Sequence, residues 1–199
     1  MKSQSVSILS TLLLIMLGLV TLADSKANAL PQNASTLPAA AAVVKARTYV
    51  SLDPVPRGSE FQAAIVVDIA RGFHMNSHKP TEAYLIPTTL TVQPPAGIQL
   101  RDAIYPGGKL EKFSFSPDAA LDVYTGSVTL RLRLAAGGGA PLGATTVPAT
   151  LRYQACNQTA CLPPVKVLIH IPFYVARAGS TTRAAHPEIF ATSGSSEQK

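Results

Sequence analysis

Apolar side chains recur at every second position in several segments of this chain. In residues 61–69, the apolar Phe61 and Ile65 alternate with the polar Gln62 and Asp68. A period of two places successive side chains on opposite faces of a β-strand, whereas an amphipathic helix has a period of 3.6. The same alternation is found in residues 128–134, 147–155 and 165–175. These four segments are predicted to be strands with one buried face.

Turn sequences rich in proline and glycine separate the strands. They read DPVPRG, QPPAG, YPGGK, SPDAA and AAGGGAPLG. Further strands are expected near residues 46–52, 86–93 and 98–105. About seven strands without a long helical pattern predict an all-β fold, namely an antiparallel β-sandwich whose two sheets face each other across one core. A small β-barrel is the alternative.

The folded domain is expected to span residues 45–175. Residues 1–29 have the layout of a secretory signal peptide, because Lys2 precedes an apolar run that ends near the small-residue triplet Ala-Asn-Ala. Residues 30–44 are expected to form a leader, and residues 176–199, rich in Ser, Thr, Gly and Ala, a disordered tail. The protein is therefore expected to be exported from the cytoplasm.

The charge distribution argues against a nucleic-acid ligand. The chain has 17 Lys and Arg residues and 11 Asp and Glu residues, which gives a formal net charge of +6. The basic residues are scattered, without runs and without interleaved aromatic residues. A solvated surface is the better interpretation of such a pattern.

The segment YQACNQTACLPP holds the only two cysteines of the chain, Cys156 and Cys161. A four-residue loop between antiparallel strands is a common hairpin size, and it can bring two Cα atoms within the roughly 4.4 to 6.8 Å that a disulfide requires. Because Cys156 follows the inward-facing Ala155, the pair is predicted to lie exposed at the mouth of a hairpin. Three interpretations stay open: a static structural disulfide, a pair that exchanges with other proteins, or a metal site completed by histidines.

Other chemistries find less support in the sequence. His74, Met75 and His78 in HMNSH could form a soft copper-binding cluster, but on a loop after a strand they are expected to be ordinary surface residues. No catalytic triad, carboxylate pair or phosphate-binding glycine loop stands out. We therefore expect no metal and no cofactor.

Three stretches resemble one family, the N-terminal periplasmic domain of the thiol:disulfide interchange reductase DsbD. They are YQACNQTACLPP, GFHMNSHKPTEAYLIPTTL and YPGGKLEKFSFSPDAALDVYTGSVTL. The similarity covers roughly residues 50–175, and its most specific part is the Tyr-Gln before the first cysteine together with the Pro-Pro after the second. The resemblance implies an immunoglobulin-like β-sandwich, thus a fold that agrees with the strand pattern.

The resemblance also implies a function as a protein-disulfide reductase component. Through Cys156 and Cys161 the domain would pass electrons to thioredoxin-fold periplasmic proteins of the disulfide isomerase or cytochrome c maturation type. Cys161 would form the mixed disulfide with the partner, and Cys156 would resolve it. A cap loop would shield the pair, with Phe113 or Phe115 as its aromatic residue.

Two departures from the family pattern limit what the resemblance implies. The loop between the cysteines is one residue shorter than in the best-known members. The membrane conduit and the C-terminal thioredoxin domain are not found in this chain, so a monomer that is reduced by a separate membrane thiol reductase is expected. The alternative is a non-enzymatic β-sandwich that binds partners and keeps a static disulfide.

Overall fold

The structure, a computed structural model, describes residues 37–191. The predicted signal peptide at residues 1–29 lies outside the described residues. A single 3-10 turn, Ala40–Ala42, leads into the first strand, which begins at Val44. No helix within residues 37–191 is long and apolar enough to cross a membrane.

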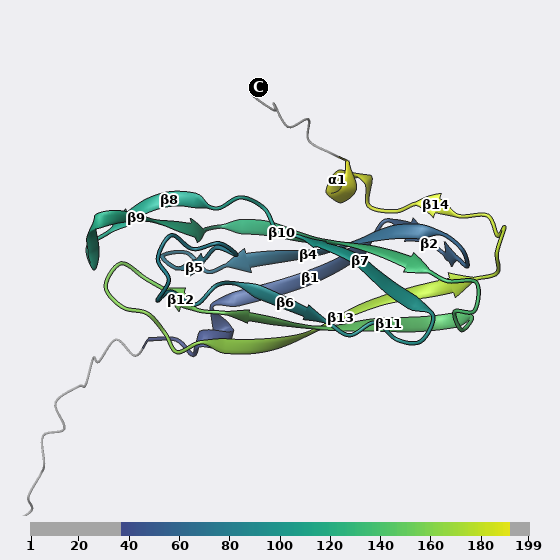
Figure 1. Cartoon of the computed structure of the whole chain (residues 1–199), viewed down its shortest axis with the longest axis horizontal. Helices are drawn as coiled ribbons and strands as arrows, with labels where there is room; N and C mark the ends of the chain where they lie inside the picture. Colours follow the sequence, from purple (N-terminus) through teal and green to yellow (C-terminus); the bar gives the residue numbers. More distant parts are fainter. Residues whose placement is uncertain (1–36, 192–199) are drawn as a thin grey trace, which may run out of the picture. The chain divides into compact units, whose positions relative to one another are not determined.

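Two four-stranded sheets form the body of the domain (Figure 1). The first has the order β1 (Val44–Val50), β4 (Glu60–Ile69), β10 (Ser127–Ala136) and β7 (Ile98–Ile104), and all its pairs are antiparallel. The second has the order β3 (Val55–Pro56), β13 (Val165–Ala176), β11 (Gly143–Tyr153) and β6 (Thr89–Val92), in which only the short β3 runs parallel to its neighbour.

The two sheets enclose one hydrophobic core between them. Most of the inward positions predicted from the alternation are buried, among them Ile65 in one sheet and Leu151 and Ile171 in the other, all at 0% exposure. The predicted inward positions Val128, Val165 and Val167 are only half-buried. Phe61 and Phe173 meet across the sandwich with their ring centroids 5.0 Å apart. The predicted immunoglobulin-like antiparallel β-sandwich is confirmed, and the alternative of a small barrel is wrong because the sheets are separate.

A third four-stranded sheet lies at one end of the sandwich, at the left of Figure 1. Its order is β12 (Ala155–Cys156), β5 (His74–Asn76), β9 (Ser116–Tyr124) and β8 (Lys109–Phe113). The sequence did not predict this sheet, and SPDAA, expected to be a turn, begins β9. Two of its strands, β12 and β5, have two and three residues and are too short to display a period, so their pairing depends on neighbours distant in sequence.

The C-terminal segment differs from the disordered tail that was expected. Within residues 176–191, β14 (Arg183–Ala184) pairs with β2 (Leu52–Asp53), and the short helix α1 (Pro187–Phe190) packs against β4. The Arg131 guanidinium donates a hydrogen bond to the Ile189 carbonyl at 2.8 Å. On β4, against which α1 packs, Ala64 and Val66 of the outer face are also buried. Polar composition alone could not reveal a segment held by backbone pairing.

Candidate functional site

Cys156 and Cys161 form a disulfide with an S–S distance of 2.04 Å. Strand β12 ends at Cys156, and Cys161 lies opposite it in an antiparallel bridge. The flanking hydrogen bonds run from the Asn157 N–H to the Ala160 carbonyl and from the Leu162 N–H to the Ala155 carbonyl, at 2.9 and 2.8 Å. The cysteines therefore occupy a non-hydrogen-bonded pair, the closer of the two antiparallel pair types. Their Cα atoms are 3.9 Å apart, which is closer than the predicted range.

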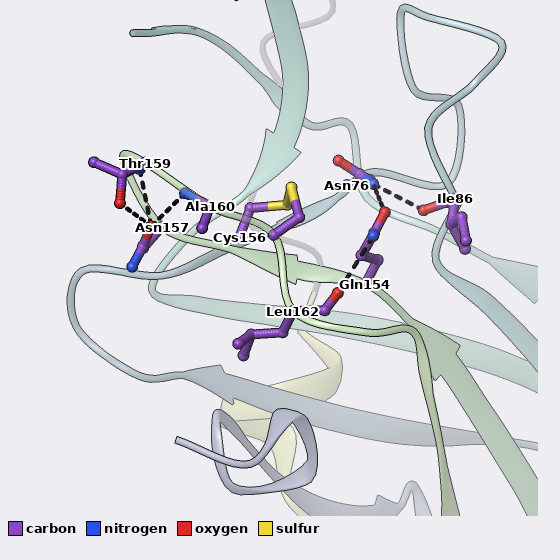
Figure 2. The surroundings of a disulfide bond; sticks show 9 residues. Asn76, Ile86, Gln154, Cys156, Asn157, Thr159, Ala160 and Leu162 are labelled. Atoms are coloured by element: carbon purple, nitrogen blue, oxygen red, sulfur yellow. Dashed lines mark hydrogen bonds between the residues drawn. A yellow bond between two sulfur atoms is a disulfide. The ribbon is translucent and has the colours of Figure 1, made fainter. Parts of the chain in front are cut away.

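The side chain of Asn157 organises the loop between the cysteines (Figure 2). Its Oδ1 accepts hydrogen bonds from the N–H of Thr159 at 2.9 Å, from the hydroxyl of Thr159 at 3.1 Å and from the N–H of Ala160 at 2.8 Å. Asparagine side chains commonly stabilise tight turns in this way. The predicted hairpin loop is confirmed, and it is held by its own side chains.

The two cysteines differ in exposure. Cys161 is exposed, whereas Cys156 is only 1% exposed. The prediction that both lie exposed is wrong for Cys156, which lies in β12 at the edge of the third sheet, directly opposite the buried His74 of β5. An external thiol or disulfide can therefore approach Cys161 but not Cys156.

The side chains of Gln154 and Asn76 connect the cysteine hairpin to neighbouring segments by hydrogen bonds (Figure 2). The Gln154 amide donates to the Leu162 carbonyl at 3.3 Å, which joins the segment before the first cysteine to the segment after the second. The fully buried Asn76 amide donates to the Ile86 carbonyl at 3.0 Å and to the Gln154 Oε1 at 3.5 Å. Sequence reasoning used this glutamine only as part of a motif and missed Asn76. The available signal was its polar side chain at the end of a short buried strand.

Tyr153, the first residue of the motif, belongs to the core rather than to the disulfide. It is 0% exposed, and its hydroxyl donates a hydrogen bond to the Ala40 carbonyl at 2.8 Å. Burial raises the pKa of Tyr153 to about 12, because the phenolate would lose its hydration. Tyr153 is therefore neutral at physiological pH and anchors the strand that leads to Cys156.

An aromatic cluster lies beside Cys156. His74 in β5 is the direct cross-strand partner of Cys156, and its ring stacks on Phe113 with centroids 4.0 Å apart. Phe115 continues the stack 5.4 Å from Phe113. Phe113 is buried, whereas Phe115 is 40% exposed.

The turn that carries these phenylalanines touches the cysteine loop directly. The hydroxyl of Ser114, between Phe113 and Phe115, donates a hydrogen bond to the Gln158 carbonyl at 2.6 Å. The β8–β9 turn and the loop between the cysteines are therefore neighbours, although they are 44 residues apart in sequence.

The two histidines of HMNSH occupy different environments. His74 was expected on the surface but is 3% exposed, and desolvation lowers its pKa to about 4. His78 stacks on Tyr105 at 3.6 Å, and its Nδ1 lies 2.9 Å from the Thr88 carbonyl oxygen. Within residues 37–191, no group of three or more His, Cys, Asp and Glu side chains is arranged to hold a metal ion.

Comparison with known families identifies the domain. The family model described as "Thiol:disulfide interchange protein DsbD, N-terminal" matches residues 40–172. The chain belongs to the DsbD N-terminal domain family. The match spans both large sheets, the third sheet and the cysteine hairpin, so the resemblance inferred from the motifs is confirmed.

Two solved structures are similar to this DsbD N-terminal family member. The DsbD N-terminal domain of Neisseria meningitidis in its reduced form has 20% sequence identity and a TM-score of 0.42, over 75% of this chain and 95% of that one. The N-terminal periplasmic domain of ScsB from Proteus mirabilis has 11% identity and a TM-score of 0.46, over 73% of this chain and 51% of that one. No curated protein matches the chain.

Membership of the DsbD N-terminal family indicates the reaction in which the disulfide takes part. The family is one of thiol:disulfide interchange proteins, and this chain places its cysteine pair on a hairpin with Cys161 exposed and Cys156 buried. The domain is a thiol–disulfide exchange module. Its fold agrees with this activity, because a rigid sandwich presents the exchanging pair at one end.

Proposed function

We propose that this domain passes two electrons from the Cys156–Cys161 dithiol to the disulfides of thioredoxin-fold partners in the periplasm. The observation that carries the proposal is the asymmetric exposure of the pair, with Cys161 accessible and Cys156 covered. A thiolate at the accessible position can reach a partner disulfide, while the covered thiol is protected from outside reagents and reacts only within the hairpin.

The exchange has two steps. The Cys161 thiolate attacks one sulfur of the partner disulfide, so that a mixed disulfide forms and the other partner sulfur leaves as a thiolate. Cys156 then loses its proton and attacks Cys161, the mixed disulfide breaks, and the second partner sulfur leaves with its electron pair. The partner disulfide is reduced by two electrons and the Cys156–Cys161 pair is oxidised by two.

The partners that suit this chemistry are thioredoxin-fold proteins of the disulfide isomerase or cytochrome c maturation type. A separate membrane thiol reductase is proposed to reduce the domain again, and the domain is proposed to act as a monomer. Residues 1–29 are proposed to be an export signal, which N-terminal sequencing of the exported protein tests.

The redox potential separates this proposal from a static disulfide. We expect the pair to equilibrate in glutathione buffers with a potential above about −300 mV, since structural disulfides of secreted proteins have potentials below that value. The measurement is the ratio of dithiol to disulfide forms after acid quenching and alkylation. A potential far below this limit, combined with no electron transfer to an oxidised thioredoxin-fold protein, would contradict the exchange function.

We also propose that Phe113 and Phe115 form a cap over the pair. The support is the stack from His74 through Phe113 to Phe115, together with the hydrogen bond from Ser114 to the cysteine loop. Replacing Phe115 by alanine is expected to make reduction of the disulfide by glutathione severalfold faster, because the exposed end of the stack no longer obstructs the approach. The matched control is Phe190→Ala, an aromatic truncation in α1. Equal rates in Phe115→Ala and the wild type would disprove the cap.

A further inference from the structure

His74 has a buried nitrogen without a hydrogen-bond partner. Among the described residues, its Nε2 accepts and donates no hydrogen bond, although the side chain is almost completely inaccessible to water. Buried polar atoms are nearly always paired, so an unpaired one requires an explanation. A group that gains its partner in another state of the protein is one such explanation.

The register of the third sheet places one group beside this imidazole. Cys156 is directly opposite His74 in the pairing of β12 with β5. Directly opposite residues of an antiparallel pair project from the same face, with Cβ atoms about 4.5 to 5.5 Å apart. Stacking on Phe113, with 21° between the ring planes, holds the imidazole in place next to the cysteine.

The structure contains the disulfide, in which Cys156 Sγ carries no hydrogen and can donate nothing. In the dithiol the same sulfur carries an S–H group. We propose that His74 Nε2 accepts a hydrogen bond from the Cys156 thiol in the reduced state and takes its proton when Cys156 resolves the mixed disulfide. This inference rests on the proposed exchange function and assigns a residue to its second step.

Resolution of the mixed disulfide by Cys156 couples a proton transfer to the disulfide exchange. The Cys156 S–H bond breaks and its proton moves to His74 Nε2, while the sulfur electron pair forms the bond to Cys161 Sγ. The bond between Cys161 Sγ and the partner sulfur breaks, and the partner sulfur leaves with that electron pair. The imidazolium then returns the proton to the departing sulfur or to water, so that His74 is neutral again.

The surroundings keep the imidazole available for this role. Burial lowers the pKa of His74 to about 4, so the ring is neutral across the physiological range and retains a lone pair for the thiol proton. The charged groups that line the hollow beside His74 are Arg71 and Glu111. Since a free thiol titrates near 8.5, most resolving thiols are protonated at neutral pH and benefit from a base.

The kinetic test uses the mature protein in its dithiol form and oxidised glutathione as the disulfide. Samples quenched in acid are analysed by mass spectrometry, which separates formation of the Cys161–glutathione mixed disulfide from its resolution by Cys156. His74→Phe preserves an aromatic ring that stacks on Phe113 but removes the base. His78→Phe is the matched control, because it removes the other stacked histidine of the same segment.

We expect His74→Phe to form the mixed disulfide at the wild-type rate but to resolve it at least about tenfold more slowly at pH 7, since general acid–base catalysis typically contributes about 10²- to 10⁴-fold. Resolution in the variant should accelerate with each rise in pH up to the thiol pKa, whereas the wild type should depend on pH only weakly above pH 5. His78→Phe should resolve like the wild type. A wild-type resolution rate and pH profile in His74→Phe would overturn the proposal.

A measurement on the unsubstituted protein keeps the proposal testable even if His74→Phe does not fold. After reduction with excess dithiothreitol, the ¹⁵N resonance of His74 Nε2 should move in the direction of hydrogen-bond acceptance, while His78 serves as the internal reference. An unchanged His74 resonance would overturn the role of His74 even if exchange with glutathione is normal. Failure of the wild type to react with any disulfide would instead refute the exchange function, and the resonance would still decide the hydrogen bond.

Discussion

Replacing Cys161 by serine is expected to abolish electron transfer to a thioredoxin-fold partner, whereas replacing Cys156 by serine is expected to trap the partner as a covalent complex. The reason is the difference in exposure: Cys161 is accessible and Cys156 is 1% exposed. Without Cys161 no sulfur can reach the partner disulfide. Without Cys156 the mixed disulfide forms but has no thiol to resolve it.

Non-reducing gel electrophoresis and mass spectrometry of the reduced variants, mixed with an oxidised partner, measure both outcomes. The double variant Cys156→Ser/Cys161→Ser is the control for noncovalent association. If Cys161→Ser trapped the partner and Cys156→Ser did not, the roles of the two cysteines would be reversed. If neither variant trapped it and the wild type transferred no electrons, the exchange function itself would be contradicted.

Replacing Gly97 by alanine is expected to produce a large loss of stability, about 3 to 4 kcal/mol in the free energy of unfolding. Gly97 has a φ of +78°, where a side chain costs about 1 to 2 kcal/mol. A Cβ at this position would also lie 2.5 Å from the Ala140 Cα and 2.9 Å from the Ala140 N. Because Ala140 is fully buried and its backbone is part of the loop after β10, the contact cannot be relieved by a side-chain rotation.

Gly126→Ala is the matched control for this prediction. Gly126 also has a positive φ, +66°, but a Cβ there would have no heavy atom within 4 Å. The loss of unfolding free energy in Gly126→Ala should be limited to the backbone contribution of about 1 to 2 kcal/mol. Urea unfolding with unchanged m-values measures both differences. Equal losses in the two variants would show that the close approach of the chains at Gly97 contributes nothing.

The long strands could be predicted from the sequence because their information is local. In β4, β11 and β13 the alternation of apolar and polar residues selects the buried face, and the inward positions Phe61, Leu151 and Ile171 are in the core as predicted. The hairpin between the cysteines was predictable for the same reason, since four residues span it. Local rules of this kind depend only on the geometry of an extended chain.

The surroundings of the cysteines could not be predicted in this way. Cys156 was expected to be exposed and His74 to be a surface residue, yet both are buried because β12 and β5 pair across about 80 residues of sequence. Neither strand has more than three residues, so the sequence contains no periodicity from which either strand could be predicted. The same holds for the C-terminal segment, whose order comes from backbone pairing of β14 with β2.

The sequence by itself therefore determined the β-sandwich, the hairpin of Cys156 and Cys161 and the family motif around it. Only the tertiary structure decided which cysteine is accessible and that an imidazole and two stacked phenylalanines lie beside the covered one. The physical reason is that an alternating strand carries its burial pattern in its own residues. The environment of a reactive sulfur, by contrast, is built from short segments that meet only when the chain has folded.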